Sequence, residues 1–127
     1  MERKVDNVIT VPAPLEGKFF EYWLSFIKPL HKLTLREIDV AASFLRQRYN
    51  LSKVISEQEL LDKVAMNDDT KKKVREECNI SQAHFQVIMT ELRKNKFIVN
   101  GRINPKFIPK ITEDSDSFKL LLLFELK

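Results

Sequence analysis

Residues 79–104, NISQAHFQVIMTELRKNKFIVNGRIN, hold the pattern that decides the fold. Ser81 is a good helix N-cap residue, and the apolar residues after it recur at spacings of three and four. This pattern predicts a helix over residues 82–95. The side chains that would face inward are Phe85, Ile88, Met89 and Leu92.

The elements on either side of this helix complete a recognisable order. Upstream, residues 70–78 read as a helix, and Asn79 suits the left-handed position that follows a helix. Downstream, two short β-prone runs flank Asn100-Gly101, the dipeptide that best fits a type I′ turn. We therefore expect a helix-turn-helix over residues 70–95 and a wing hairpin over residues 97–104, the order found in winged helix-turn-helix domains.

Three further helices are expected before this motif, over residues 16–28, 35–49 and about 57–66. Thr34 and Ser56 each stand three residues before a glutamate, which is the capping-box pattern. A chain of 127 residues with only two glycines favours one mainly helical domain with a small β part.

The two ends of the chain read differently from the helical core at 16–111. Residues 1–15 are predicted to form an extended arm, and residues 112–127 a polar loop followed by a strand at 118–126. This strand carries five successive apolar residues, a pattern typical of a strand covered on both faces. It could complete the sheet of the wing or pair with a neighbouring subunit.

Charge is distributed unevenly along the sequence. The whole chain has a formal net charge of +4, but residues 70–110 hold ten basic and three acidic residues, a local surplus of +7. Such a surplus is typical of a polyanion-binding surface, although solvated helix faces also carry lysine runs.

The sequence offers little for catalysis. Cys78 is the single cysteine and is best explained as a small apolar residue. His84 lies six residues after it, but no third ligand lies at metal spacing from the two. With two glycines there is no phosphate-binding loop. We expect no enzyme activity, cofactor, metal or small-molecule substrate. The longest apolar run, 120–124, is too short for a membrane span, and no signal peptide is visible, so we expect a cytoplasmic site of synthesis.

If the motif binds DNA, the reading helix would supply base contacts and nearby basic residues would supply phosphate contacts. The helix is neutral over its first turns, however, and Val87 holds its exposed centre. The candidate base-contacting residues are Gln82, His84, Gln86 and Thr90. The candidate phosphate-contacting residues are Lys71, Lys73, Arg93, Lys94, Arg102 and Lys106.

A neutral face of Ala, Gln, Val and Thr suits a protein contact at least as well. The helix at 16–28 also has a wide apolar sector, more than one small core usually buries. The candidate protein-interface residues are Phe19, Phe20, Trp23, Phe26, Val87, Leu121 and Leu123.

The segments LTLREIDVAASFLRQRY (33–49), NISQAHFQVIMTELRKNKFIVNGRINPKFIPKI (79–111) and SFKLLLLFELK (117–127) are similar to small proteins of tailed bacteriophages. The resemblance is to crAss-like phages of gut Bacteroidota in particular. It implies a virion protein, for example an oligomeric ring or adaptor at the portal–tail neck, assembled in the host cytoplasm with other phage structural proteins. Such phages also encode winged-helix regulators. The alternative is therefore a DNA-binding transcriptional regulator in the bacterial cytoplasm.

Overall fold

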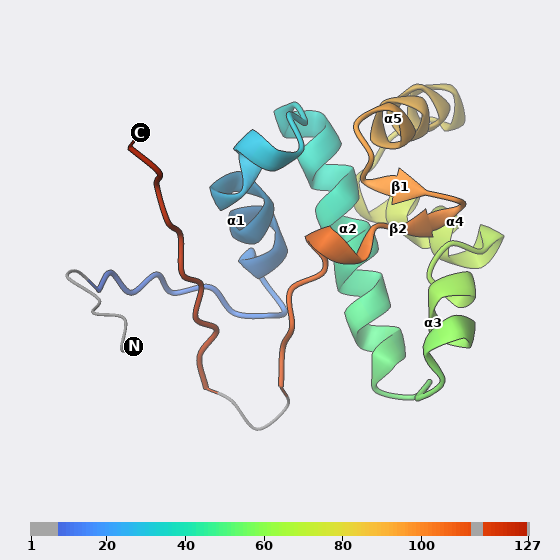
Figure 1. Cartoon of the computed structure of the whole chain (residues 1–127). Helices are drawn as coiled ribbons and strands as arrows, with labels where there is room; N and C mark the ends of the chain where they lie inside the picture. The colour runs from blue at the N-terminus through green and yellow to red at the C-terminus, as the bar shows by residue number, and fades with distance from the viewer. Residues whose placement is uncertain (1–7, 113–115, 127) are drawn as a thin grey trace.

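The computed structural model describes residues 8–112 and 116–126, and it is mainly helical with one small antiparallel sheet (Figure 1). Residues 1–7 of the expected arm, 113–115 of the expected polar loop, and Lys127 lie outside the described residues. The helices are α1 (Phe19–Phe26), α2 (Leu35–Ser52), α3 (Gln58–Val64), α4 (Asp68–Glu77) and α5 (Gln82–Lys94). The strands are β1 (Ile98–Val99) and β2 (Arg102–Ile103), and two short 3-10 helices are η1 (Lys28–Leu30) and η2 (Pro105–Phe107).

Helix α2 is the centre of the fold, and α1, α3, α4 and α5 all pack against it (Figure 1). Its start is fixed by the predicted capping box. The backbone N–H of Glu37 donates to Thr34 Oγ1 at 3.4 Å, and the N–H of Thr34 donates to Glu37 Oε1 at 3.1 Å. Ile38, Ala41 and the other apolar residues facing the core are buried, so the helix contributes along most of its length.

The two helices predicted within residues 70–95 are present as α4 and α5. Asn67 accepts from the N–H of Thr70 at 2.8 Å, so α4 begins two residues earlier than expected. Ser81 Oγ accepts from the N–H of His84 at 3.1 Å, which confirms it as the N-cap of α5. Between the helices, Asn79 has a φ of 52°, the left-handed conformation that the sequence indicated.

The hairpin also forms where it was expected. Ile98 pairs with Ile103 and Val99 pairs with Arg102 in antiparallel register. Asn100 and Gly101 both have positive φ, 55° and 73°, as a type I′ turn requires. β1 contacts α5 and β2 contacts α3, so the hairpin is held between these two helices.

Other helix boundaries also differ from the sequence-based expectation. α1 is shorter than the predicted 16–28, because the chain turns into η1 at Lys28 and Pro29. The predicted Ser56 capping box is wrong: the N-cap of α3 is Glu57, and no side chain caps it. The turn that closes α2 extends to Ile55, whose N–H donates to Leu51 O at 2.9 Å, so the first helical residue falls at Gln58.

The C-terminal segment does not complete the sheet. The sheet of the described chain has two strands, and residues 116–126 run extended without strand pairing. Each hairpin strand is only two residues long and offers few backbone groups to a longer strand. The ring of Phe118 instead lies against Phe19 and Trp23 of α1, with centroid distances of 5.3 and 5.5 Å. The start of the segment is therefore held on α1 and not on the hairpin.

Candidate interaction surfaces

The outward face of α5 has the composition that the sequence predicted. Gln82, Ala83, Gln86 and Thr90 are exposed, and the side chain of Val87 at their centre is 61% exposed. The opposite face packs into the core through its apolar residues. The hydroxyl of Thr90 donates to the carbonyl of Gln86 at 3.1 Å, so this group is already hydrogen-bonded within the helix.

The basic residues around the motif fall into two groups. Lys73, Arg93 and Lys94 are exposed and Lys71 is half-buried. Within the part of the chain that the structure describes, none of these four takes part in an ion pair. They therefore remain available to an anionic partner.

Arg102 and Lys106 belong to the second group, because neighbouring side chains engage them. The Nη2 of Arg102 lies 3.8 Å from Glu59 Oε1 on α3. The Nζ of Lys106 lies 5.6 Å from the centre of the Phe107 ring. Arg102 of the hairpin thus faces the acidic side of α3, and it is less available to contact a phosphate.

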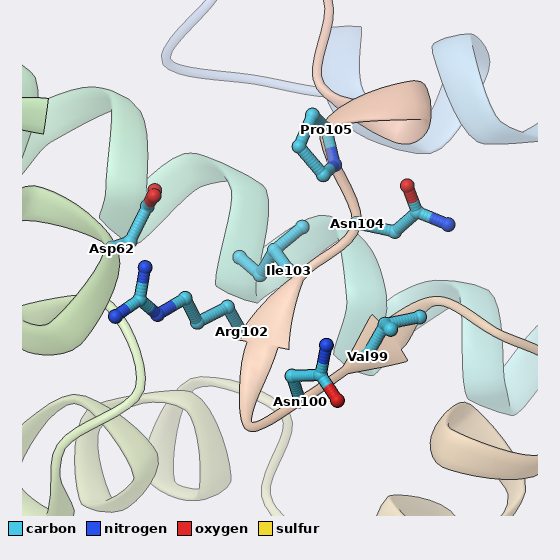
Figure 2. Close-up of a pocket in the computed structure, with 7 residues that line it drawn as sticks. All are labelled: Asp62, Val99, Asn100, Arg102, Ile103, Asn104 and Pro105. Atoms are coloured by element: carbon cyan, nitrogen blue, oxygen red, sulfur yellow. The ribbon is translucent and has the colours of Figure 1, made fainter. Parts of the chain in front are cut away.

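An open pocket of about 490 Å³ lies between α3 and the hairpin. The guanidinium of Arg102 extends toward α3, which carries Asp62, and Asn100 and Asn104 also line the pocket (Figure 2). Asp62 Oδ1 also accepts from Arg48 Nη2 at 3.0 Å. The charges at this pocket are therefore largely matched by the chain's own residues.

The aromatic residues of α1 divide between core and surface. Phe19 and Phe20 are buried, Phe20 to 1% exposure, so these two candidate interface residues pack inside their own chain. Trp23 is half-buried, and its Nε1 donates to the carbonyl of Phe107 at 2.8 Å, which ties α1 to η2. Phe26 is 56% exposed and is the most exposed of the four candidate interface residues on α1.

Sequence reasoning missed two neighbours of Phe26. Tyr22 and Leu30 are also exposed, and the three residues follow one another at spacings of four. For Tyr22 that spacing was the available signal, because residues four apart share one face of a helix. Phe26 and Tyr22 thus form a small exposed apolar patch on α1, and Leu30 is exposed in the following η1.

The C-terminal segment carries the largest run of exposed apolar side chains. The candidate residues Leu121 and Leu123 are both exposed, Leu123 to 68%, and Phe124 is 82% exposed. Phe118 is half-buried against α1. Adjacent exposed apolar side chains of this kind are a common feature of binding surfaces.

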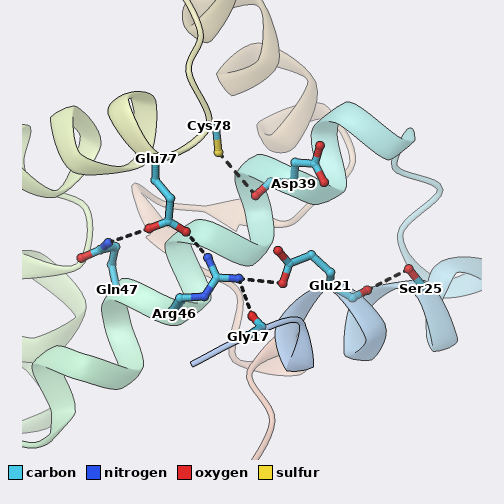
Figure 3. Close-up of polar contacts among 8 residues, drawn as sticks. All are labelled: Gly17, Glu21, Ser25, Asp39, Arg46, Gln47, Glu77 and Cys78. Atoms are coloured by element: carbon cyan, nitrogen blue, oxygen red, sulfur yellow. Dashed lines mark hydrogen bonds and ion pairs between the residues drawn. The ribbon is translucent and has the colours of Figure 1, made fainter. Parts of the chain in front are cut away.

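One polar cluster was not anticipated, and it lies between three helices. Arg46 of α2 pairs with Glu21 of α1 and Glu77 of α4, and its Nη2 also donates to the carbonyl of Gly17 at 3.3 Å (Figure 3). Gln47 Nε2 donates to the other oxygen of Glu77 at 3.2 Å. These residues hold α1 and α4 to the central helix, so their role is structural.

The histidine and the cysteine also have structural environments. His31 is buried, its Nδ1 accepts from the N–H of Leu33 at 2.9 Å, and its Nε2 therefore donates to the carbonyl of Leu24 at 2.7 Å. Burial lowers the pKa of His31. Cys78 is half-buried, its Sγ lies 3.6 Å from the carbonyl of Asp39, and burial raises its pKa.

Among the described residues, no three His, Cys, Asp or Glu side chains come together as metal ligands would. None of the helices described here has the length and apolar character that crossing a bilayer demands. No family model, no curated protein and no solved structure matches this chain.

Proposed function

We propose that this protein is a non-catalytic assembly protein of a tailed phage virion. It binds further copies of itself and other phage structural proteins, as a ring or adaptor component at the portal–tail neck. The observation that carries the proposal is the uncharged outer face of α5, with Val87 exposed at its centre. The phage setting comes from the sequence resemblance, and the site of assembly would be the host cytoplasm.

The chemistry of the α5 face favours polypeptide over DNA. Base edges in the major groove are read by hydrogen bonds, most often from arginine, lysine, asparagine or glutamine. Here two glutamines, Gln82 and Gln86, and His84 could serve, but Val87 stands among them and Thr90 already bonds its own helix. An apolar centre with a polar rim is instead the usual anatomy of a protein interface.

Further apolar surfaces lie elsewhere on the molecule. Phe26 is exposed on α1, and Leu121 and Leu123 are exposed on the C-terminal segment. A closed ring requires two different patches on each subunit, since each copy contacts one neighbour through each patch. Separate patches on α5, α1 and the C-terminal segment meet that requirement.

Substitution of Val87 tests the proposal. Val87→Arg places a charge at the centre of the α5 face and should weaken self-association in sedimentation experiments, without changing thermal stability. Val54→Arg is the matched control, because Val54 is 81% exposed in the turn after α2 and lies outside the face. Equal sedimentation of Val87→Arg and Val54→Arg would show that the outer face of α5 is not part of the self-association interface.

The second candidate is a winged-helix DNA-binding regulator. The order α4, α5, β1, β2 favours it, as do Lys71, Lys73, Arg93 and Lys94, which make no ion pair with a described residue. In this alternative the hairpin would be the wing and α5 would enter the major groove. Selection of one duplex from a random pool by the purified protein would support it.

A further inference from the structure

The C-terminal segment 118–126 has the properties of a strand that lacks its partner. Its residues run extended, and none of them forms a backbone hydrogen bond with another described residue. Most of its apolar side chains are exposed, up to 82% for Phe124 and 92% for Leu126. Unpaired backbone groups beside apolar side chains are what an added β-strand would satisfy.

The chain's own hairpin is a poor partner for this segment. β1 and β2 are two residues each, and Phe118 holds the start of the segment on α1 through Phe19 and Trp23. No strand in the described part of this chain matches the segment in length, so a second molecule can supply the partner strand.

The sequence of the segment is complementary to itself when read backwards. In an antiparallel pair centred on Leu122, Lys119 stands opposite Glu125 of the second copy, and Glu125 opposite the second Lys119. The positions between these charges are all leucine or phenylalanine in both strands. Two opposite-charge pairs therefore enclose an apolar centre.

Other arrangements lose this match. A parallel pair in register sets Lys119 against Lys119 and Glu125 against Glu125, and like charges directly opposite destabilise a sheet. An antiparallel pair shifted by two residues in one direction sets Lys119 opposite a leucine. Shifted in the other direction, it places Lys119 past Glu125 of the second copy. Both shifts lose the opposite-charge pairs. The charges thus select one direction and one register.

We propose that two copies of this protein pair through residues 118–126 as antiparallel β-strands centred on Leu122. The pair is isologous, so each copy presents the same strand to the other. Phe118, Leu120, Leu122, Phe124 and Leu126 then share one face of the two-stranded ribbon, and Phe118 lies opposite Leu126 of the second copy. Because Phe118 rests on α1, that exposed leucine is brought beside the α1 aromatic residues. The inference deepens the proposed self-association and rests on it.

Charge reversal tests the register. Lys119→Glu and Glu125→Lys each create two like-charge pairs, and each should weaken dimerisation roughly tenfold at low salt in sedimentation equilibrium. The double variant Lys119→Glu/Glu125→Lys restores both pairs and should return to wild-type affinity. Lys119 and Glu125 are exposed, so none of these variants should disturb the fold. Added salt should reduce the differences in dimerisation affinity between the single variants and wild type, because it screens exposed charges.

A disulfide test reads the geometry directly, in a Cys78→Ser background. Leu122→Cys places two sulfurs opposite each other at a Cα separation compatible with a disulfide, so mild oxidation should give covalent dimers. Lys119→Cys places the two sulfurs roughly 20 Å apart and should not. Cross-linking through position 119 as readily as through 122 would indicate a parallel pair, and cross-linking through 119 alone would indicate another register; either result would overturn the proposal.

The outcomes separate the two proposals. If the wild-type chain self-associates, charge reversal has no effect and no cross-link forms at position 122, the strand pairing is overturned. The proposed assembly role would then depend on the α5 face alone. A chain that is monomeric at every concentration overturns the strand pairing and the proposed self-association together. Loss in both single variants with recovery in the double variant supports both.

Discussion

Arg46 and Glu21 join the central helix to α1, with Nη2 of the arginine 2.6 Å from Oε1 of the glutamate. Both side chains are largely shielded, at 16% and 20% exposure. The same guanidinium pairs with Glu77 of α4, so one residue of α2 connects helices on both sides of it.

Removal of this arginine should destabilise the protein. Arg46→Ala leaves the largely shielded carboxylate of Glu21 without its partner and also removes the pair with Glu77, so we expect a loss of about 2 kcal/mol in the free energy of unfolding. Urea denaturation measures it. Arg93→Ala is the control, since Arg93 is exposed and makes no ion pair among the described residues, and it should change stability by less than about 0.5 kcal/mol. Equal losses in the two variants would contradict this role for Arg46.

His31 should make stability depend on pH. Its Nδ1 accepts from the N–H of Leu33, so protonation of that nitrogen removes an acceptor inside the fold. Burial is the main cause of the lowered pKa, and Lys28 adds to it. The unfolded chain therefore binds a proton more readily than the folded one below the ordinary histidine pKa of about 6.5. Stability should be fully present above that pH and should fall as the pH drops toward the lowered pKa of the folded state.

The variant His31→Gln separates this effect from carboxylate titration. It should be less stable than wild type at neutral pH, because it loses a buried ring. Its stability should change less than that of wild type between pH 7 and the lowered pKa. Thermal melts across this range measure both slopes, and parallel slopes would exclude His31 as the source.

The hairpin turn should depend on glycine at one position. Gly101 has a φ of 73°, and a Cβ added there would meet no atom within 4 Å, so Gly101→Ala costs backbone strain alone. We expect a loss of about 1 kcal/mol in the free energy of unfolding. Gly17→Ala is the matched control, because its Cβ would make an ordinary 3.5 Å contact with Pro14 O. It should be neutral or slightly stabilising, and a larger loss at Gly17 than at Gly101 would refute the turn assignment.

DNA binding, if present, should be independent of sequence. Arg93 and Lys94 can contact phosphates, so titration of a labelled duplex should give affinities that fall steeply with salt. Replacing either basic residue by alanine should reduce the salt slope by about 1, whereas Gln82→Ala and Gln86→Ala should have no effect. A preference of ~10³-fold for one duplex, lost in the glutamine variants, would favour the regulator.

Local signals in the sequence were sufficient for most of the helical fold. Ser81, Thr34 and Asn100-Gly101 act through neighbours a few residues away, and the structure confirms the cap or turn predicted at each. Ser56 failed because the turn that closes α2 moved the start of α3 by one residue. A capping pattern identifies a helix start only when the preceding element ends where expected.

Contacts between distant residues could not be predicted in this way. Arg46 meets Glu21 and Glu77 across separations of 25 and 31 residues, and no periodicity reports such pairs. For the same reason Phe20 was grouped with surface residues, although its own chain buries it. The apolar pattern of residues 118–126 identified a strand-like segment, but the pattern alone did not exclude the two-residue strands of the hairpin as its partner.

Sedimentation velocity over a wide range of protein concentrations, with and without a labelled random-sequence duplex, tests the central claim most directly. The account predicts that the sedimentation coefficient of the wild-type chain rises with protein concentration in the absence of DNA. The rise should be reduced by Val87→Arg but not by Val54→Arg. A chain that stays monomeric alone, and assembles only when the duplex is added, would contradict it.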